Sequence, residues 1–225
     1  MNTAITITPK RNDPVADLKL VDAYFRWALL SIVEVAGEHG LDSVLQRVGM
    51  ERFRQCYASD RLEPVSGLTF GDFATINEGV IQVIGANGPD NVFHSGRVSA
   101  RHAMRRNGNI FHPPTQLING QLDQVDRVRA SLETILAGYK GVAQNADLPY
   151  HAWLEETDEH FYYHLESCAV CAGKSSSEPI CLFFSGSLME SLKWYTGNTY
   201  TVEEIACRAM NDPACVWRID KQPAE

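Results

Sequence analysis

The sequence of 225 residues lacks the features that define several large protein classes. No apolar run approaches the roughly 18 residues of a membrane-spanning helix, so we expect no membrane span. Its 20 basic residues are outnumbered by 28 acidic ones, and Arg105-Arg106 is the strongest basic cluster, so we expect no binding to nucleic acid. The chain starts with Met1-Asn2-Thr3-Ala4 and shows no apolar segment of a secretory signal there. We therefore expect a cytoplasmic protein.

Motifs of the common enzyme classes are also missing. No glycine-rich stretch stands between a strand and a helix in the way that nucleotide-binding loops require. No serine, histidine and aspartate fall into the context of a known hydrolase. A binding role is therefore favoured over an enzymatic one, although the sequence leaves the question of activity open.

Cysteine is the residue type whose distribution carries the most information. Six cysteines are present, and the run Glu204-x2-Cys207-x7-Cys215 ends in the turn 211–214, which can fold Cys215 back beside Cys207. Three thiolates and one carboxylate suit a tetrahedral Zn²⁺. We predict structural zinc on four ligands: Cys181, Glu204, Cys207 and Cys215. Buried free cysteines are the alternative, and a disulfide is disfavoured because nothing directs the chain to an oxidising compartment.

This ligand set places a condition on the strand that carries Glu204. Side chains alternate between the two faces of a flat strand, so Glu204 and Cys207 would point in opposite directions. Both can reach one ion only if the strand is bulged or ends near Ile205. Glu203 has the parity of Cys207 but lies too far along the strand to share a tetrahedral ion with it.

The pattern of apolar residues divides the chain into three parts. Residues 1–16 show no periodicity and are expected to form a flexible tail. Residues 17–148 show helical periodicity, and the Gly-x2-Gly-x-Asp-x-Val frame of residues 37–44 returns at residues 85–92, which suggests a duplicated helix–turn–helix unit. Residues 149–220 change to short aromatic-rich runs typical of a β-β-α-β-β unit with an antiparallel sheet. The expected fold class is α+β.

The periodicity also predicts individual elements. Helices are expected at about 21–36, 41–57, 70–84, 90–106, 122–141 and 185–197, and strands at 150–156, 160–167, 199–206 and 215–219. The first of these helices is too apolar to be freely exposed, so we predict that it forms a symmetric homodimer contact. The residues on which this prediction depends are Tyr24, Phe25, Ala28, Leu29, Ile32 and Val33.

Several motifs of the last part occur together in a known family. They are Pro179-Ile180-Cys181, Gly186, Glu190, Trp194-Tyr195-Thr196-Gly197, Val202-Glu203-Glu204, Cys207-Arg208-Ala209-Met210 and Asp212-Pro213-Ala214-Cys215-Val216-Trp217. Residues 150–219 thereby resemble the 4-vinyl reductase domain. That domain occurs in hydrocarbon-binding proteins, in the sensory domains of phenol- and xylene-responsive activators and in a bacteriochlorophyll-biosynthesis protein. It is similar in fold to subunits of the eukaryotic vesicle-tethering complex.

The resemblance implies a zinc-stapled αβ module that lines an apolar pocket and is often dimeric. In the phenol-sensing relatives an early Cys and a later Glu-x2-Cys-x7-Cys hold zinc, which matches Cys181 and the 204–215 run. Cys168 and Cys171 are additional to that pattern. They could join the ligand set, hold a second metal, act as a redox dithiol or remain two reduced thiols in a loop.

The pocket is expected between the N-terminal helices and a sheet face that carries Trp153, Phe161 and Tyr163. His160 or Trp153 would donate a hydrogen bond to a mostly apolar ligand. The function expected from these observations is that of a sensor or carrier for a small hydrophobic or aromatic molecule. The alternatives are an enzyme or accessory factor in tetrapyrrole metabolism of the bacteriochlorophyll type, and a structural assembly module.

Overall fold

The computed structural model describes residues 5–83, 87–106, 111 and 122–224. Helices and strands alternate in blocks, as expected for an α+β chain. The elements are β1 (Ile7–Pro9), η1 (Pro14–Asp17), α1 (Asp22–Val48), η2 (Glu51–Phe53), α2 (Phe70–Val83), α3 (Gly88–Arg106), α5 (Gln124–Asn145), β2 (Ala152–Glu156), β3 (His160–Leu165), β4 (Lys174–Ser176), α6 (Leu182–Thr196), β5 (Tyr200–Ala206), η4 (Arg208–Met210) and β6 (Cys215–Pro223).

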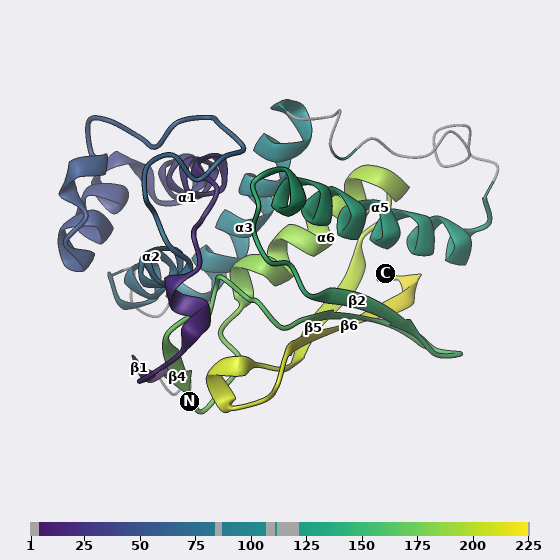
Figure 1. Cartoon of the computed structure of the whole chain (residues 1–225). Coiled ribbons are helices and arrows are strands. Elements are labelled where there is room, and N and C mark those ends of the chain that lie inside the picture. Colours follow the sequence, from purple (N-terminus) through teal and green to yellow (C-terminus); the bar gives the residue numbers. More distant parts are fainter. Residues whose placement is uncertain (1–4, 84–86, 107–110, 112–121, 225) are drawn as a thin grey trace.

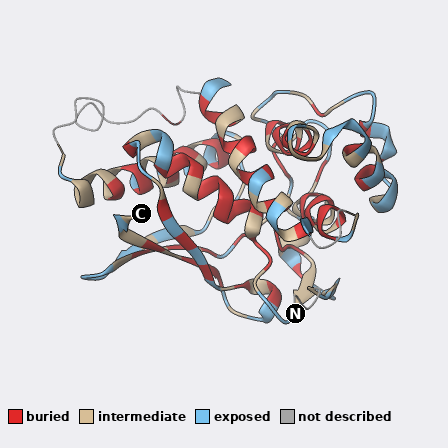
Figure 2. Cartoon of the chain, turned by 180° about the vertical axis from the view of Figure 1, so that it is seen from behind, coloured by how far each residue is buried: buried red, intermediate tan, exposed pale blue. Residues whose placement is uncertain are grey.

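The main sheet has four antiparallel strands in the order β2-β3-β6-β5. Helices α5 and α6 lie over one face of this sheet, and α1, α2 and α3 pack beside them (Figure 1). Buried residues gather where the helices meet each other and the sheet (Figure 2). The predicted β-β-α-β-β order with an antiparallel sheet is therefore confirmed, with the short strand β4 as an addition before α6.

The helical part follows the predicted periodicity except near its glycines. Helix α1 is interrupted at Gly37, whose φ of 76° lies in the left-handed region that favours glycine, and then continues to Val48. It ends at Gly49, also left-handed, and not near residue 57 as the sequence suggested. Helices α2 and α3 match their predicted ranges within a few residues. Residues 84–86, where the second copy of the duplicated frame would turn, lie outside the described residues.

Helices α3 and α6 cross at very short range because each has a glycine at the crossing. A Cβ atom on Gly96 would lie 1.9 Å from the carbonyl oxygen of Phe183, and one on Gly186 would lie 2.0 Å from that of Phe93. No side chain fits at such distances. These two glycines thus fix the separation of the helices that form the centre of the molecule.

The sheet presents alternate residues to the helices and to solvent. In β3, Phe161, Tyr163 and Leu165 are buried against the helices, while the residues between them are partly exposed. The indole of Trp217 in β6 is fully buried and donates a hydrogen bond to Ser185 Oγ of α6 at 2.9 Å. Sheet and helices are therefore joined by aromatic packing.

The N-terminal segment is more ordered than the expected flexible tail, as far as the described residues show. Strand β1 pairs with β4, and Asp13 is buried. Its carboxylate accepts hydrogen bonds from the Arg208 guanidinium at 2.8 Å and from the Gly173 amide at 2.9 Å. A long-range buried ion pair is not visible as a local pattern, which is why periodicity did not predict it.

The apolar face that suggested a homodimer is used inside the chain. Phe25, Ala28, Leu29 and Ile32 of α1 are at most 2% exposed within a single copy. The reason for expecting a dimer was therefore wrong, because the face packs against neighbouring helices of the same chain. The homodimer itself stays a prediction. No helix in the described ranges is both long and apolar enough to cross a membrane.

Candidate metal site and ligand cavity

Five cysteines meet in the interior of the C-terminal module. Cys168 and Cys171 belong to the loop between β3 and β4, Cys181 precedes α6, Cys207 follows β5, and Cys215 begins β6. Each of the five is at most 1% exposed, whereas the sixth cysteine, Cys56, is exposed. The fold therefore gathers all the cysteines of the last part of the chain into one cluster, which we call the thiol cluster.

A bulge in β5 brings Glu204 and Cys207 to the same site. Glu204 pairs with Trp217 while Ala206 pairs with Val216, so β5 has one extra residue at Ile205. Glu204 is 9% exposed and Cys207 is fully buried on the side of the helices. The condition set by the sequence pattern, a bulge near Ile205, is met.

The turn after η4 brings Cys215 beside Cys207. Asn211 adopts a left-handed conformation with φ of 74°, and Asp212 Oδ2 accepts a hydrogen bond from the Cys207 amide at 2.9 Å. The Arg208 amide donates to Cys215 Sγ at 3.4 Å. Asparagine tolerates this conformation better than most residues, so the local sequence specifies the turn.

The sulfur separations match those of a metal site. Sγ–Sγ distances are 3.5 Å for Cys168–Cys181 and Cys171–Cys215, 3.6 Å for Cys181–Cys215 and 3.7 Å for Cys181–Cys207. A disulfide bond would be about 2.05 Å long. Zinc–sulfur bonds of about 2.3 Å place the sulfurs of a tetrahedral site about 3.8 Å apart. The cysteines are thus free thiols spaced like tetrahedral ligands.

Two sets of four ligands are preformed in the thiol cluster. One is the predicted set of Cys181, Glu204, Cys207 and Cys215, and the other is Cys168, Cys171, Cys181 and Cys215. Within each set all ligand atoms lie within 4.8 Å of one another. The structure therefore brings the four predicted ligands together and also places Cys168 and Cys171 at the same centre.

The electrostatics of the thiol cluster favour a cation. Burial, together with the neighbouring Cys207 and Cys168, raises the pKa of Glu204 to about 10. Glu204 Oε2 accepts the Cys181 amide at 2.7 Å, but Oε1 is buried without a hydrogen-bond partner in the part of the chain that the structure describes. Burial also raises the pKa of the Cys181 thiol. A divalent ion would supply the missing partner and stabilise the deprotonated ligands.

A cavity of about 120 Å³ lies next to the thiol cluster, among α1, α3, α5, α6 and the loop that follows β3. Its lining is apolar and aromatic, with a few hydroxyl groups and no Lys, Arg, Asp, Glu or His among the described lining residues. The side chains that line it include Tyr24, Trp27, Phe73, Ala100, Ala103, Met104, Tyr139, Tyr150, Phe183, Phe184 and Ser187. Such a lining suits an uncharged ligand.

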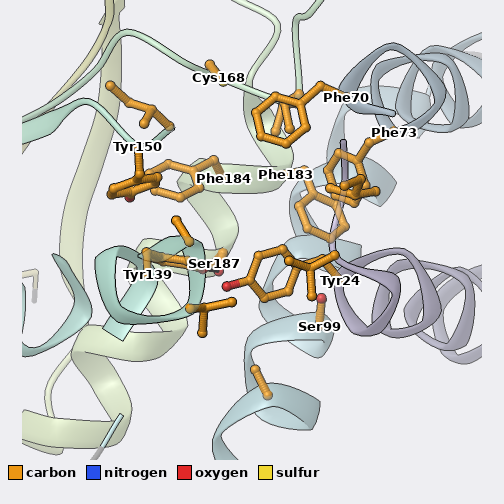
Figure 3. Close-up of a pocket in the computed structure, with 18 of the residues that line it drawn as sticks. Tyr24, Phe70, Phe73, Ser99, Tyr139, Tyr150, Cys168, Phe183, Phe184 and Ser187 are labelled. Atoms are coloured by element: carbon orange, nitrogen blue, oxygen red, sulfur yellow. Dashed lines mark hydrogen bonds between the residues drawn. The ribbon is translucent and has the colours of Figure 1, made fainter. Parts of the chain in front are cut away.

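The hydroxyl groups of the cavity differ in how well they are satisfied. Tyr150 and Tyr163 share a hydrogen bond of 2.6 Å, and Tyr139 contacts Ser187 Oγ at 3.5 Å. The Tyr24 hydroxyl is buried without a partner among the described residues, and burial raises its pKa well above the usual value. Figure 3 shows Tyr24 facing Tyr139 across the cavity, with its hydroxyl directed toward Ser187. Tyr24 thus offers a neutral, unused hydrogen-bonding group.

Cys168 belongs to both features. Its thiol is 3.5 Å from that of Cys181, and the residue also lines the cavity. The thiol cluster and the cavity therefore share a wall, which Figure 3 shows at the upper edge of the pocket.

The predicted pocket residues are divided between the two faces of the sheet. Phe161 and Tyr163 face the helices, but neither lines the cavity directly. Trp153 is 42% exposed and stacks on His164 at 4.6 Å on the opposite face, and His160 lies there beside Asp220. The predicted wall of Trp153, Phe161 and Tyr163 is therefore not formed. The physical reason is the register: Trp153 pairs with His164, so Leu154 and not Trp153 shares a face with Tyr163.

The residues that do line the cavity were largely missed. Tyr24 was assigned to a dimer contact, and Tyr139 and Phe184 were treated as ordinary helix positions. The signal in the sequence was weak: α6 begins with the pair Phe183-Phe184, so that aromatic groups point to two sides of one helix. Which helices these rings would meet depends on tertiary packing.

Comparison with known proteins supports both the local motifs and the overall fold. The model of the 4-vinyl reductase domain family matches residues 161–221. An uncharacterized protein of Methanocaldococcus jannaschii, MJ0745, is 32% identical over 56 residues, which are 25% of this chain and 31% of that protein. The match thus spans about a third of the length of that relative.

Solved structures of H-NOX proteins share the fold over nearly the whole chain. A single-substitution variant of Tt H-NOX has a TM-score of 0.57 at 13% identity and covers 92% of this chain and 97% of its own. A mutant H-NOX protein from S. oneidensis has 0.57 at 14% (92% and 98%), and an oxygen-binding H-NOX domain related to soluble guanylate cyclases has 0.53 at 13% (91% and 96%). The chain therefore carries a 4-vinyl reductase domain at residues 161–221, built into a larger unit with the H-NOX fold.

Proposed function

We propose that this chain is a binding protein, a sensor or carrier, for a neutral aromatic molecule about the size of one ring, with structural zinc in the thiol cluster. The observation that carries the proposal is the apolar cavity with the unpartnered Tyr24 hydroxyl. A dry apolar cavity of about 150 Å³ is sufficient to bind benzene in another protein. A phenol-like ligand would fill the cavity of about 120 Å³ and satisfy Tyr24.

Zinc fits the thiol cluster by the chemistry of its ligands. Cys181, Glu204, Cys207 and Cys215 would hold it, as the matching spacing in phenol-sensing relatives implies. An ion with four protein ligands has no open position for water, so zinc would supply stability and no hydrolytic chemistry. This supports a binding protein over a zinc hydrolase.

Heme, the subject of one of the similar solved structures, does not fit this cavity. Heme iron in proteins is held by a histidine, a cysteine thiolate, a methionine or a tyrosine. The described lining contains no histidine, and Cys168 faces the other thiols of the cluster. Met104 Sδ already contacts the Tyr195 hydroxyl at 3.5 Å. Pockets for ligands much larger than one ring generally exceed about 300 Å³, so the cavity also disfavours the tetrapyrrole alternative.

The test is a thermal-shift series on the zinc-loaded protein with benzene, toluene, phenol, a long-chain fatty acid and hemin. We expect the single-ring compounds to raise the melting temperature with the logarithm of their excess, and phenol to act at the lowest concentration. Tyr24→Phe should weaken phenol binding by about tenfold, the value of one hydrogen bond, and leave toluene unchanged. Tyr162→Phe, on the outer face of β3, is the matched control.

Two outcomes would overturn the proposal. If none of these compounds shifts the melting temperature, the cavity is a packing defect and the structural-module alternative gains. If hemin produces a larger shift than any single ring at equal concentration, the ligand belongs to the tetrapyrrole class. Metal content measured on the same samples separates loss of ligand binding from loss of zinc.

A further inference from the structure

The thiol cluster contains more ligands than one ion can use. A tetrahedral zinc ion takes four ligands, whereas five thiols and one carboxylate meet here. An ion on the predicted set leaves Cys168 and Cys171 unused, and an ion on the four-cysteine set leaves Glu204 and Cys207 unused. The unused pair would in either case be buried polar groups beside a highly charged centre.

The two sets share Cys181 and Cys215, whose sulfur atoms are 3.6 Å apart. This shared edge has tetrahedral length, and the further contacts extend from it in both directions. Cys168 and Cys171 lie 3.5 Å from Cys181 and Cys215, respectively. Cys207 lies 3.7 Å from Cys181. The arrangement is that of two tetrahedra joined along one edge.

We propose that the thiol cluster holds two thiophilic divalent ions, such as Zn²⁺, bridged by the thiolates of Cys181 and Cys215. Cys168 and Cys171 complete one ion, and Glu204 and Cys207 complete the other. This proposal extends the zinc site of the proposed function and depends on it. The spacing Cys168-x2-Cys171 is one in which two neighbouring thiolates commonly bind the same zinc ion.

The charge balance is acceptable for a buried centre. Five thiolates and one carboxylate carry six negative charges, of which two divalent ions offset four. The residual charge equals that of a single zinc ion on four such ligands with the remaining thiols protonated. The Arg208 amide donates to the bridging Cys215 Sγ at 3.4 Å, and Arg208 is itself held by Asp13 at 2.8 Å. Each thiol that becomes a ligand releases its proton to solvent.

Both bridging residues are placed by well-defined local structure. Cys181 is the residue before α6, where the unpaired amides of a helix N-terminus favour negative charge. Cys215 is the first residue of β6 and pairs with Leu165 of β3. Bridging thiolates, which contact two cations, thus come from rigid elements, while Cys168 and Cys171 come from the adjoining loop.

The experiment is a metal count on the full-length protein. Native mass spectrometry and elemental analysis should give two zinc ions per chain for the wild type. The double variant Cys168→Ser/Cys171→Ser and the double variant Glu204→Gln/Cys207→Ser should each retain one. Cys56→Ser, which changes the exposed cysteine, should retain two.

Cobalt titration of the metal-free wild type gives a second test that needs no variant to fold. Sulfur-to-cobalt charge-transfer absorbance should rise until two equivalents of Co²⁺ are bound. Thiolate-bridged Co²⁺ ions couple magnetically, so the moment per ion should fall between the first and second equivalents. Saturation at one equivalent, with one zinc per wild-type chain, would overturn the bridged centre and leave the single-zinc site intact. Absence of any metal would overturn both.

Discussion

The thiol cluster and the cavity share Cys168 but are assembled in different ways. Every ligand of the cluster lies between residues 168 and 215, and most come from turns or strand ends of one module. The cavity takes its lining from residues 20 to 191, so that helices far apart in the sequence form one wall. A metal site therefore leaves a local signature in the sequence, whereas an apolar cavity is recorded only in how the helices pack.

The strongest way to test this contrast is to remove a ligand that both four-residue sets use. Cys181→Ser should lower the metal content to near zero and reduce the free energy of unfolding by on the order of 5 kcal/mol. Structural zinc contributes about 10 kcal/mol or more in small peptides, and less is expected where a core already exists. Metal analysis and urea denaturation measure both effects.

Cys56→Ser is the matched control, because Cys56 is exposed and lies outside the thiol cluster. It should change the free energy of unfolding by less than about 0.5 kcal/mol. If Cys181→Ser is as stable as Cys56→Ser and the wild type, the thiol cluster is a set of buried free cysteines.

The next largest effect is expected at the helix crossing that frames the cavity. Gly186→Ala would place a Cβ atom 2.0 Å from the carbonyl oxygen of Phe93, so α3 and α6 must separate. We expect a loss of about 3 kcal/mol in the free energy of unfolding, at the upper end of overpacking effects. Denaturation in urea is the measurement.

Gly141→Ala provides the control within α5, since a Cβ atom there meets nothing within 4 Å. Helix propensity predicts that this change stabilises the protein by about 0.5–1 kcal/mol. Equal effects at Gly186 and Gly141 would show that the close crossing does not hold the helices in place.

The same contrast explains which predictions from the sequence succeeded. Helix and strand order followed from periodicity, because each amphipathic segment in the described part buries its own apolar face. The bulge at Ile205 could be anticipated because Glu204 and Cys207 differ in strand parity, so shared ligation required it. These inferences needed only local geometry.

The remaining features depend on long-range pairing. The position of Trp153 was misjudged because its face is set by pairing with His164. The apolar face of α1 was assigned to a second copy because the sequence does not say which neighbouring helix covers it. Asp13 and Arg208 form a buried ion pair 195 positions apart, which no local pattern reveals.

Filling the cavity should separate the two features functionally. Ala103→Leu adds three carbon atoms to the wall of a cavity of about 120 Å³. We expect the affinity for phenol to fall at least tenfold, measured by thermal shift, because the ligand would clash with the new side chain. Metal content should be unchanged. Ala137→Leu, at an exposed position of α5, should leave ligand binding unaffected. An unchanged phenol response in Ala103→Leu would place the ligand elsewhere.

The smallest effect is expected at the ion pairs that attach α5 to the sheet. Arg129 of α5 donates to both carboxylate oxygens of Glu156 at 2.7 and 2.8 Å, and Lys221 of β6 donates at 2.6 Å. These hydrogen bonds lower the pKa of Glu156 to about 2. The group is largely solvated, so screening limits its contribution to at most about 1 kcal/mol.

The pH dependence of this contribution follows from the direction of the shift. Because the pKa of Glu156 is lower in the folded chain, the stabilisation is complete above the unfolded value of about 4.3 and is lost as the pH falls toward 2. Glu156→Gln should therefore lower the melting temperature slightly at pH 7 and low salt, and the difference should shrink in high salt or at pH 2–3. Glu133→Gln, exposed on the same helix, is the control. A difference that persists at pH 2 would mean that packing and not charge joins α5 to the sheet, and the wall of the cavity would then rest on apolar contacts alone.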